Sequence, residues 1–491
     1  MEAMCMKKYF QTGAMFACVL FTAGCASVSG RNNKQEASLT VKNYSSYSFV
    51  PSVSYQTIDG FGAAYTWYAD WIQHDQIGAE KAYDALFSDA KLSVLRLKNE
   101  YEYKETKTAP NGKAIAEYYT AAVKRCAAYG EKPVVLLCCW SPPASLKSNN
   151  GIPGKDGATL KKNADGAYCY EEYGQWWTDA VLYYRNLGIQ IDFVSIQNEV
   201  EFTASYDGCR FDPQESGSCA SYAKAFLSVY RHFKQAFGSS APKMLAPETM
   251  SCVWGTISPY IKPILAEEPD SIYGIAHHLY VGGTSDSDKN EVDPDSYLVN
   301  FMTLNQFYGT TRKWQTEFYI GHALQTAKLI NNSLVYENAN AYLYWSGVWH
   351  TNGSAFETGE LINAEWNGRW YLCADYYVMR HFSEFVRPGY VRIKSITGDT
   401  NVASSAYISP DKSKVAVILI NLSENVKRYA ISSNGEYAVS SVTAYQSVFG
   451  DKALSADTCY KTVNLANENK IVLPPKSMTT IVITGSENNE Q

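Results

Sequence analysis

The sequence predicts an α/β fold, because apolar runs and amphipathic segments alternate along most of the chain. Short runs rich in β-branched and other apolar residues can form buried parallel strands, and segments with a helical period of apolar residues lie between them. After residue 389 the helical period disappears, and short β-like runs punctuated by Ser, Asn and Gly take its place. We therefore expect a parallel α/β part followed by an antiparallel β part.

Taken in order, the alternation gives eight strands and eight helices, which predicts a (β/α)8 TIM barrel. The expected strands are Ile58–Gly62, Ser93–Leu97, Pro133–Cys138, Phe193–Gln197, Lys243–Ala246, Gly274–Leu279, Lys313–Thr316 and Ala341–Trp345. The expected helices are Glu80–Phe87, Ile115–Tyr129, Glu171–Asn186, Tyr222–Phe237, Ile257–Glu267, Ser296–Phe307, Ala323–Tyr336 and Arg369–Phe382.

The expected domains follow from these boundaries. The barrel would span residues 58–389, and an antiparallel β-sandwich side domain would span residues 390–485, where runs such as Val415–Ile420 and Thr479–Ile483 are found. Residues 47–57 alternate apolar and polar side chains and are expected to form N-terminal strands. No low-complexity linker separates barrel and side domain, so a rigid joint is expected.

The N-terminus has the features of an export signal. Residues 1–25 contain Lys7-Lys8, an apolar stretch from Gly13 to Ala23 and then small residues. Thr22-Ala-Gly-Cys25 resembles a bacterial lipoprotein cleavage site, which predicts a lipid anchor on Cys25, a tether over residues 26–46 and a place at the cell surface or outer membrane. The departure is Thr22, where such sites usually carry Leu, so ordinary secretion is the alternative.

Composition limits the partners of the chain. The net charge of −6 with mixed signs argues against a nucleic-acid surface and, outside the lipid anchor, no contact with a membrane is expected. The 38 Tyr and 11 Trp offer flat rings that can stack on sugars, although most such residues fill cores. We expect a monomer that acts on a polysaccharide.

Cysteine spacing indicates no metal site, and no phosphate-binding glycine loop is found, so neither a metal nor a cofactor is expected. Cys209 and Cys219 flank a Gly/Ser-rich loop and could pair. Cys138 and Cys139 lie in an apolar strand and are expected to be small core residues.

Two of the expected strands end in carboxylates. The run from Phe193 stops at Gln197-Asn198-Glu199, and the run from Lys313 stops at Glu317. In an eight-stranded α/β barrel the carboxyl ends of the strands carry the chemistry. Two carboxylates are also the minimum equipment for retaining glycoside hydrolysis, one as acid/base and one as nucleophile.

Six short motifs in the same order resemble the landmarks of glycoside hydrolase family 30, of clan A. They are Gln56-Thr-Ile-Asp-Gly-Phe-Gly62, Ser141-Pro-Pro-Ala144, Ser195-Ile-Gln-Asn-Glu199, Ala246-Pro-Glu248, Thr316-Glu317 and Val386-Arg-Pro-Gly-Tyr-Val-Arg-Ile393. The resemblance runs from about Tyr55 to Ile393, with the endoxylanase and glucuronoxylanase branch as the nearest part of the family. It implies that residues 47–57 join the β side domain.

The resemblance also implies roles for individual residues. Glu199 would be the acid/base, with Glu201 as its competitor, and Glu317 would be the nucleophile. Asn198 matches the clan residue that hydrogen-bonds the sugar 2-hydroxyl, and Arg96 matches an arginine beneath the nucleophile. Four residues at strand ends would line the bottom and the sides of the substrate subsite: Trp140, His278, Tyr280 and Trp345. Glu248 would orient its neighbours or serve the structure, and His277 would be a buried, hydrogen-bonded histidine.

These roles imply double displacement on a plant cell-wall β-glycan, with β-1,4-xylan as the first choice and endo action. The stretch Tyr344-Trp-Ser-Gly-Val-Trp-His-Thr351 lacks the arginine with which glucuronate-reading xylanases bind a carboxylate, so a neutral backbone is expected. The alternatives are a β-1,6-glucanase or galactanase, an exo-acting β-glucosidase, and a non-catalytic glycan-binding lipoprotein.

Overall fold

The computed structural model describes residues 43–102, 110–286, 291–350, 358–449, 458–463, 465 and 469–488. The predicted signal, most of the predicted tether and Cys25 lie outside these residues. In the described part of the chain, we find no helix with the length and apolar character needed to cross a membrane.

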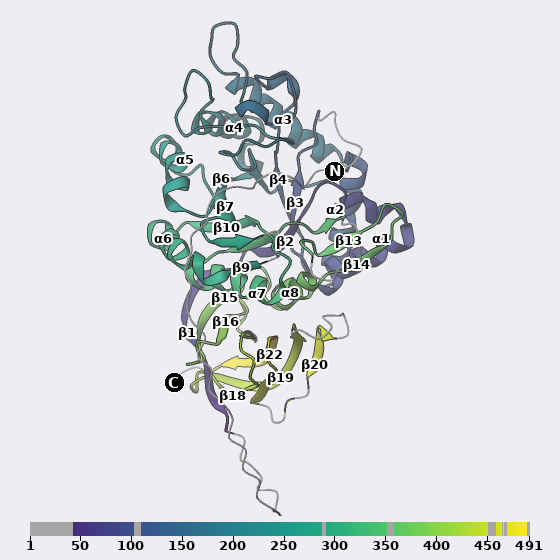
Figure 1. The fold of residues 1–491 in the computed structure, drawn as a ribbon, viewed down its shortest axis with the longest axis vertical. Helices are drawn as coiled ribbons and strands as arrows, with labels where there is room; N and C mark the ends of the chain where they lie inside the picture. Colours follow the sequence, from purple (N-terminus) through teal and green to yellow (C-terminus); the bar gives the residue numbers. More distant parts are fainter. Residues whose placement is uncertain are drawn as a thin grey trace, which may run out of the picture. The chain divides into compact units, whose positions relative to one another are not determined.

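Eight parallel strands close into a barrel, which confirms the predicted fold class. Its strands in chain order are β2 (Gly60–Tyr65), β3 (Val94–Lys98), β4 (Val134–Cys138), β5 (Phe193–Ser195), β6 (Lys243–Ser251), β7 (Gly274–Val281), β10 (Arg312–Glu317) and β11 (Ala341–Tyr344), and β11 closes the ring on β2. The helices are α1 (Gln76–Tyr83), α2 (Gly112–Ala127), α3 (Tyr170–Asn186), α4 (Tyr222–Phe237), α5 (Trp254–Glu267), α6 (Leu298–Tyr308), α7 (Ala323–Asn332) and α8 (Ala374–Ser383), as Figure 1 shows.

Several boundaries differ from the predicted ones. A π-helical turn continues α1 through Asp84–Asp89, and another continues α7 through Ser333–Glu337. The helix predicted from Arg369 begins only at Ala374, because Trp370–Leu372 form strand β14, which pairs with β13 (Ile362–Ala364) across the turn at Asn367-Gly368. The prediction of a helical start at Arg369 was therefore wrong. Further short strands are β8 (Thr284–Asp286), β9 (Glu291–Asp293) and β12 (Val348–Trp349).

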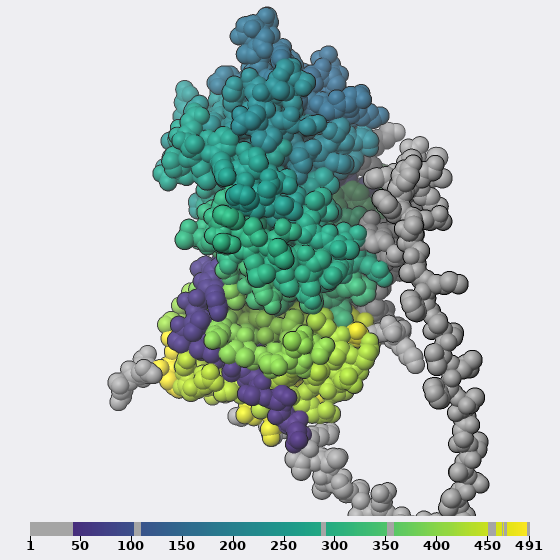
Figure 2. Space-filling model, turned by 60° about the vertical axis from the view of Figure 1, so that its left-hand side comes forward, coloured from purple at the N-terminus to yellow at the C-terminus, as the bar shows by residue number. Residues whose placement is uncertain are grey.

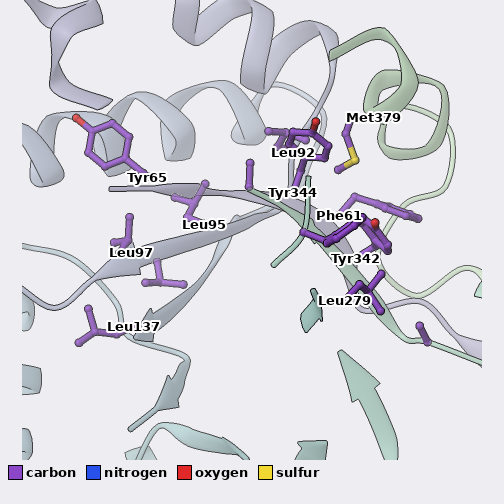
Figure 3. Packing of buried hydrophobic residues seen from close by; sticks show 14 of the residues in the cluster. Phe61, Tyr65, Leu92, Leu95, Leu97, Leu137, Leu279, Tyr342, Tyr344 and Met379 are labelled. Atoms are coloured by element: carbon purple, nitrogen blue, oxygen red, sulfur yellow. The ribbon is translucent and has the colours of Figure 1, made fainter. Parts of the chain in front are cut away.

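Apolar side chains fill the barrel and the layer between its strands and helices. Val94, Leu136, Phe193, Leu245 and Trp314 form a cluster of buried residues from five of the barrel strands. A larger cluster joins the strands to the helices, and Figure 3 shows Phe61 of β2, Tyr342 of β11 and Met379 of α8 within it. This rigid core fixes where the strand ends lie.

The side domain is a sheet of nine strands, and the N-terminal strand takes part in it. The order is β20-β19-β22-β17-β16-β15-β1-β18-β21. The strands are β1 (Ser45–Thr57), β15 (Val391–Ile396), β16 (Val402–Ile408), β17 (Lys414–Asn421), β18 (Lys427–Ser432), β19 (Tyr437–Val448), β20 (Lys461–Val463), β21 (Lys470–Leu473) and β22 (Ser477–Glu487). Strand β1 pairs antiparallel with β15 and parallel with β18, and Figure 2 shows it in purple across the yellow-green C-terminal strands. The parallel pair departs from the expected antiparallel pattern.

A buried histidine of the barrel bonds to the side domain. Nδ1 of His381, in α8, lies 2.9 Å from Oγ1 of Thr480, and its Nε2 lies 2.8 Å from Oγ of Ser447. Since all three side chains are buried, barrel and side domain share a polar joint that water does not reach.

The possible disulfide between Cys209 and Cys219 is not present. Both thiols are buried and free, and Sγ of Cys219 lies 3.7 Å from Oγ1 of Thr159. Cys138 is a buried core residue as expected, but its Sγ also donates a hydrogen bond to Oε2 of Glu248 at 2.9 Å.

Candidate active site

The two predicted carboxylates meet at the carboxyl end of the barrel. Glu199 follows β5, the fourth strand of the barrel, and Glu317 is the last residue of β10, the seventh. Ligand atoms of Glu199, His278 and Glu317 all lie within 4.8 Å of one another, and the three residues are buried. Retaining glycosidases hold their two carboxyl groups about 5–5.5 Å apart, whereas inverting ones need about 6.5–9.5 Å. The separation observed here fits the retaining arrangement.

The backbone at the acids is strained. Glu199 has a φ of 48°, and Glu248, inside the neighbouring β6 where its register with β7 shifts, has a φ of 64°. Side chains other than glycine rarely adopt this left-handed region, and such residues concentrate at functional sites. The strained backbone thus coincides with two of the acids of the site.

Arg96 of β3 organises the carboxylates from below. Its Nη1 donates to Oε2 of Glu317 at 2.6 Å, and its Nη2 donates to Oδ1 of Asn198 at 2.6 Å. The same guanidinium pairs with Glu248 at 2.9 Å and lies 4.6 Å from the ring centroid of Trp140. Burial alone would lower the pKa of Arg96, but Glu248 and Glu317 raise it, so the site contains a permanent buried cation.

Glu317 accepts hydrogen bonds on both of its oxygens. Oε2 bonds to Arg96, and Oε1 accepts from the phenol of Tyr280 at 3.0 Å. These two donors hold the carboxylate in one orientation at the end of its strand. The arginine expected beneath the nucleophile is therefore in contact with Glu317, whereas Nζ of Lys313, on the same strand as Glu317, donates to the backbone carbonyls of Tyr308 and Thr311.

The pKa of Glu199 is shifted by its surroundings. Burial raises its pKa above the ordinary value, and the charge of Glu317 raises it further, while the hydrogen bond from His278 and the charge of Arg96 oppose the rise. A carboxyl group with a raised pKa keeps its proton at a pH where free glutamic acid is ionised. Glu199 therefore suits the general acid, and Glu317 suits the nucleophile.

His278 of β7 lies between two acids. Its Nδ1 is 3.2 Å from Oε1 of Glu199, and its Nε2 is 3.7 Å from Oε1 of Glu248. Burial would lower the pKa of His278, but the charge of Glu317 and the contacts with Glu199 and Glu248 raise it to about 9. The pKa of Glu248 falls to about 2, because Arg96 and His278 outweigh the effect of burial. The floor of the site is a charged network of two cations and three acids.

Aromatic rings wall a cavity of about 570 Å³ above the carboxylates. Of the predicted substrate-binding residues, Trp140, Tyr280 and Trp345 line it. Arg96 and His278 contact the carboxylates and Glu248 from beneath, and Asn198 accepts a hydrogen bond from Arg96. Several further residues that were not predicted from the sequence also line the cavity, namely Trp67, Tyr68, Phe202, Tyr206, Asp207, Met250, Tyr319 and Trp349. The pair Trp67-Tyr68 directly after the first barrel strand was a signal that could have found two of them.

Other singled-out residues lie away from this cavity. Nε2 of His277 is 2.7 Å from Oε1 of the buried Glu337, as expected of a structural histidine. The competitor Glu201 is absent from the described residues that line the cavity, and burial raises its pKa to about 7. The bonds of Glu248 to Arg96 and Cys138 give it a place beneath the reacting pair.

Glu199, His278 and Glu317 also form the one group of possible metal ligands among the described residues. The guanidinium of Arg96 already occupies one oxygen of Glu317, and the raised pKa of His278 favours its cationic form. Both features oppose a metal ion at this position. The predicted absence of a metal stays a prediction.

A closed (β/α)8 barrel with paired carboxylates at its fourth and seventh strand ends is typical of barrel glycoside hydrolases. Comparison with known proteins points to one family of these. The model of the glycosyl hydrolase family 30 beta sandwich domain matches residues 389–481. Glucuronoxylanase XynC of Bacillus subtilis (strain 168) is 26% identical over 359 residues, which cover 71% of this chain and 71% of that protein.

Two further similarities extend the comparison. Endo-1,6-beta-D-glucanase neg1 of Aspergillus fumigatus is 21% identical over 310 residues, or 57% of each chain. The solved catalytic domain of GH30 xylanase C from Talaromyces cellulolyticus superimposes with a TM-score of 0.68 at 22% identity, covering 89% of this chain and 100% of that one. The resemblance to glycoside hydrolase family 30 and to its xylanase branch is confirmed, and it supports O-glycoside hydrolase activity.

Proposed function

We propose that this chain is a retaining, endo-acting β-glycanase with Glu199 as acid/base and Glu317 as nucleophile, and that its substrate is a neutral plant cell-wall glycan, β-1,4-xylan first. The observation that carries the proposal is the separation of the two acids, whose oxygens lie within 4.8 Å beneath an aromatic cavity. The similarity to a glucuronoxylanase and an endo-1,6-glucanase supports endo action on a β-glycan.

The geometry supports a double displacement. In the first step Glu317 attacks the anomeric carbon while Glu199 gives its proton to the departing glycosidic oxygen, so that a glycosyl ester forms and the C–O bond breaks. Arg96 and Tyr280 hold the carboxylate of Glu317 until it reacts. In the second step water attacks the anomeric carbon, Glu199 takes a proton of that water, and the bond to Glu317 breaks, so that the carboxylate is restored and the configuration is retained.

The charges of the cavity favour a neutral sugar backbone. Among the described residues that line it, the acidic ones are Glu199, Asp207 and Glu317, and none is an arginine or lysine. Arg369, the arginine closest after Trp345 in sequence, bonds to Glu365 on an exposed turn. A lining without an arginine or lysine offers a glucuronate side group no basic partner, so recognition of that group is not part of the proposal.

The alternatives share the fold and the two acids. A β-1,6-glucanase is supported by the similarity to the Aspergillus fumigatus enzyme, and an exo-acting β-glucosidase would release single sugars. A non-catalytic binding lipoprotein would use the aromatic cavity without turnover. Export, a lipid anchor on Cys25 and a monomeric state complete the proposal, and each remains to be measured.

The test is the product profile from glucuronoxylan, linear arabinoxylan and β-1,6-glucan, with Glu317→Ala as control. The proposal expects neutral xylo-oligosaccharide ladders from both xylans, abolished by the substitution. Acidic oligosaccharides alone would mean that glucuronate is read, and activity on the glucan alone would replace the substrate but keep the two acids. A parent chain that binds glycan without releasing any product from it would support the binding lipoprotein.

A further inference from the structure

A row of aromatic rings leaves the cavity and ends at the surface. We call Trp349, Tyr68, Trp71 and Trp366 the aromatic track. Successive ring centroids lie 5.0 Å apart for Trp349 and Tyr68, 5.1 Å for Tyr68 and Trp71, and 5.3 Å for Trp71 and Trp366. The first two residues line the catalytic cavity, whereas Trp366 is 63% exposed. The track therefore connects the cavity with solvent.

A turn with several side-chain hydrogen bonds holds the outer end of the aromatic track. Trp366 lies between β13 and β14, where Glu365 bonds to Arg369 and accepts from the phenol of Tyr371 at 3.1 Å. Nδ1 of His74 is 2.8 Å from the carbonyl oxygen of Trp366. These contacts fix the backbone on which the exposed indole stands.

The same turn is anchored against the start of the barrel. Nε1 of Trp370 donates to the carbonyl oxygen of Gly78 in α1 at 2.9 Å. Gly368 has a φ of 86°, and a Cβ there would lie 2.5 Å from the backbone nitrogen of Asp75, so only glycine permits this approach. Figure 1 shows β13 and β14 beside α1, far apart in sequence. An exposed tryptophan on a fixed support loses little conformational freedom when it binds a ligand.

The inner end shows backbone strain. Tyr68 has a φ of 59° and a ψ of −3° directly before the 3-10 helix Ala69–His74, which is uncommon for an aromatic residue. Its ring also contacts His350 at 4.3 Å. Strained residues persist where the surrounding structure determines them, and they cluster at ligand-binding positions. Tyr68 thus joins the cavity to the outer part of the track.

We propose that the aromatic track binds the part of a β-linked glycan that extends beyond the catalytic cavity, with Trp366 stacking on a distal sugar. This inference rests on the proposed function, because it assigns the substrate of the same site. Successive rings of the track meet edge to face, at interplanar angles of 80° to 84°, so the inner rings pack against one another while Trp366 keeps 63% of its surface exposed at the outer end. Flat amphipathic rings present an apolar face to the C–H face of a sugar. Because the track begins at residues that line the catalytic cavity, we expect the same glycan chain that is cleaved there to occupy the track.

The test is the dependence of kcat/KM on substrate length, measured on an oligosaccharide series from whichever β-glycan the parent enzyme cleaves. We expect Trp366→Ala to lower the ratio of kcat/KM for long over short oligosaccharides about tenfold, which corresponds to about 1.4 kcal/mol. Trp366→Phe keeps a ring and should retain most of the ratio. The control is Phe307→Ala in α6, which removes an aromatic side chain that is 54% exposed and stacked on Trp254.

The outcomes separate this inference from the proposed function. If the parent enzyme has no activity on xylan, the proposal of xylan as the substrate is refuted. The length dependence on the glycan that is cleaved still decides whether Trp366 binds a distal sugar. An unchanged long-to-short ratio in a folded Trp366→Ala chain overturns the aromatic track, as does an equal drop in Phe307→Ala. A second measurement does not need turnover: the retardation of the Glu317→Gln chain in gels that contain the glycan. We expect this retardation to be smaller when Trp366→Ala is added, and an unchanged retardation overturns the inference.

Discussion

Two equally buried histidines in this molecule have opposite environments. His278 at the active site and His381 at the joint with the side domain are both 0% exposed. Carboxylates surround His278 and raise its pKa to about 9 against the effect of burial. His381 bonds only to the hydroxyl groups of Thr480 and Ser447 in the described part of the chain, and burial lowers its pKa to about 3.

The difference shows that neighbours, not depth, decide the charge of a buried group in this protein. Burial acts on both rings in the same direction, so the contrast comes from Glu199, Glu248 and Glu317. A charged network is costly to bury and is retained where chemistry uses it, whereas a hydroxyl-bonded neutral ring serves packing. The predictions that follow test whether one region is functional and the other structural.

The largest effect is expected at the two acids. Glu317→Gln removes the nucleophile and should lower kcat by about four orders of magnitude or more, and Glu199→Gln should lower it about 10²–10⁴-fold. The measurement is the initial rate on the glycan that the parent enzyme cleaves. Glu201→Gln is the matched control two residues from Glu199 and should keep most of the activity. If Glu201→Gln is as inactive as Glu199→Gln, the assignment of proton transfer to Glu199 alone is contradicted.

Removal of Glu248 tests the network beneath the acids. Glu248→Gln leaves Arg96 and His278 with one carboxylate fewer and should cost about 3–5 kcal/mol of unfolding free energy, since both partners are buried. The folded pKa of about 2 lies below the ordinary 4.5, so this stability is present above pH 4.5 and is lost as pH falls toward 2. The unfolding free energies of the parent chain and of Glu248→Gln, measured with urea, should therefore approach each other as the pH falls. A constant difference across that range would contradict the lowered pKa.

A smaller effect on the pH profile is expected from His278→Gln. The histidine lowers the pKa of Glu199 through its hydrogen bond and charge, so the pKa of Glu199 rises when His278 is removed. The high-pH limb of kcat/KM, where the general acid loses its proton, should move to higher pH. His277→Gln is the control on the same strand, because its Nε2 faces Glu337 instead. A shift to lower pH in the His278 variant would show that this ring is not cationic.

The smallest effect is expected at His381. Its folded pKa of about 3 lies below the ordinary 6.5, so the unfolded state binds more protons between these values and stability falls as pH drops below 6.5. His381→Gln removes this titration, and its unfolding free energy should depend less on pH from 6.5 to 4. The rate profile at the active site should stay the same. An equally steep pH dependence in the variant would mean that His381 is not neutral in the folded chain.

The sequence predicted the fold and the strand-end acids because these depend on local patterns. The strand from Phe193 ends in Asn198-Glu199, and the barrel places that end beside Glu317 without any further information. The resemblance to family 30 added Arg96 beneath the nucleophile, and the hydrogen bond to Glu317 at 2.6 Å fits that expectation. Roles assigned to these residues remain predictions until variants are measured.

Other features depend on contacts between distant segments, which no local pattern encodes. The motif Ala246-Pro-Glu248 singled out Glu248 but not its partners, and in the structure Glu248 is completely buried and bonded to Arg96 and Cys138. The sequence did not indicate the turn that carries Trp366, because residues of β14 were predicted to start a helix. The contact of Trp366 with Trp71 joins the segments that follow the last and the first barrel strand in sequence. Tertiary packing determined both outcomes.

The central claim is a retaining mechanism through Glu199 and Glu317, and the most direct test is the anomeric configuration of the first product. Proton NMR of a fresh digest of the cleaved β-glycan, recorded before mutarotation, distinguishes the two anomers. The account predicts that the β-anomer forms first, because two displacements retain the configuration. An α-anomer as the first product would mean a single displacement by water and would contradict Glu317 as the nucleophile.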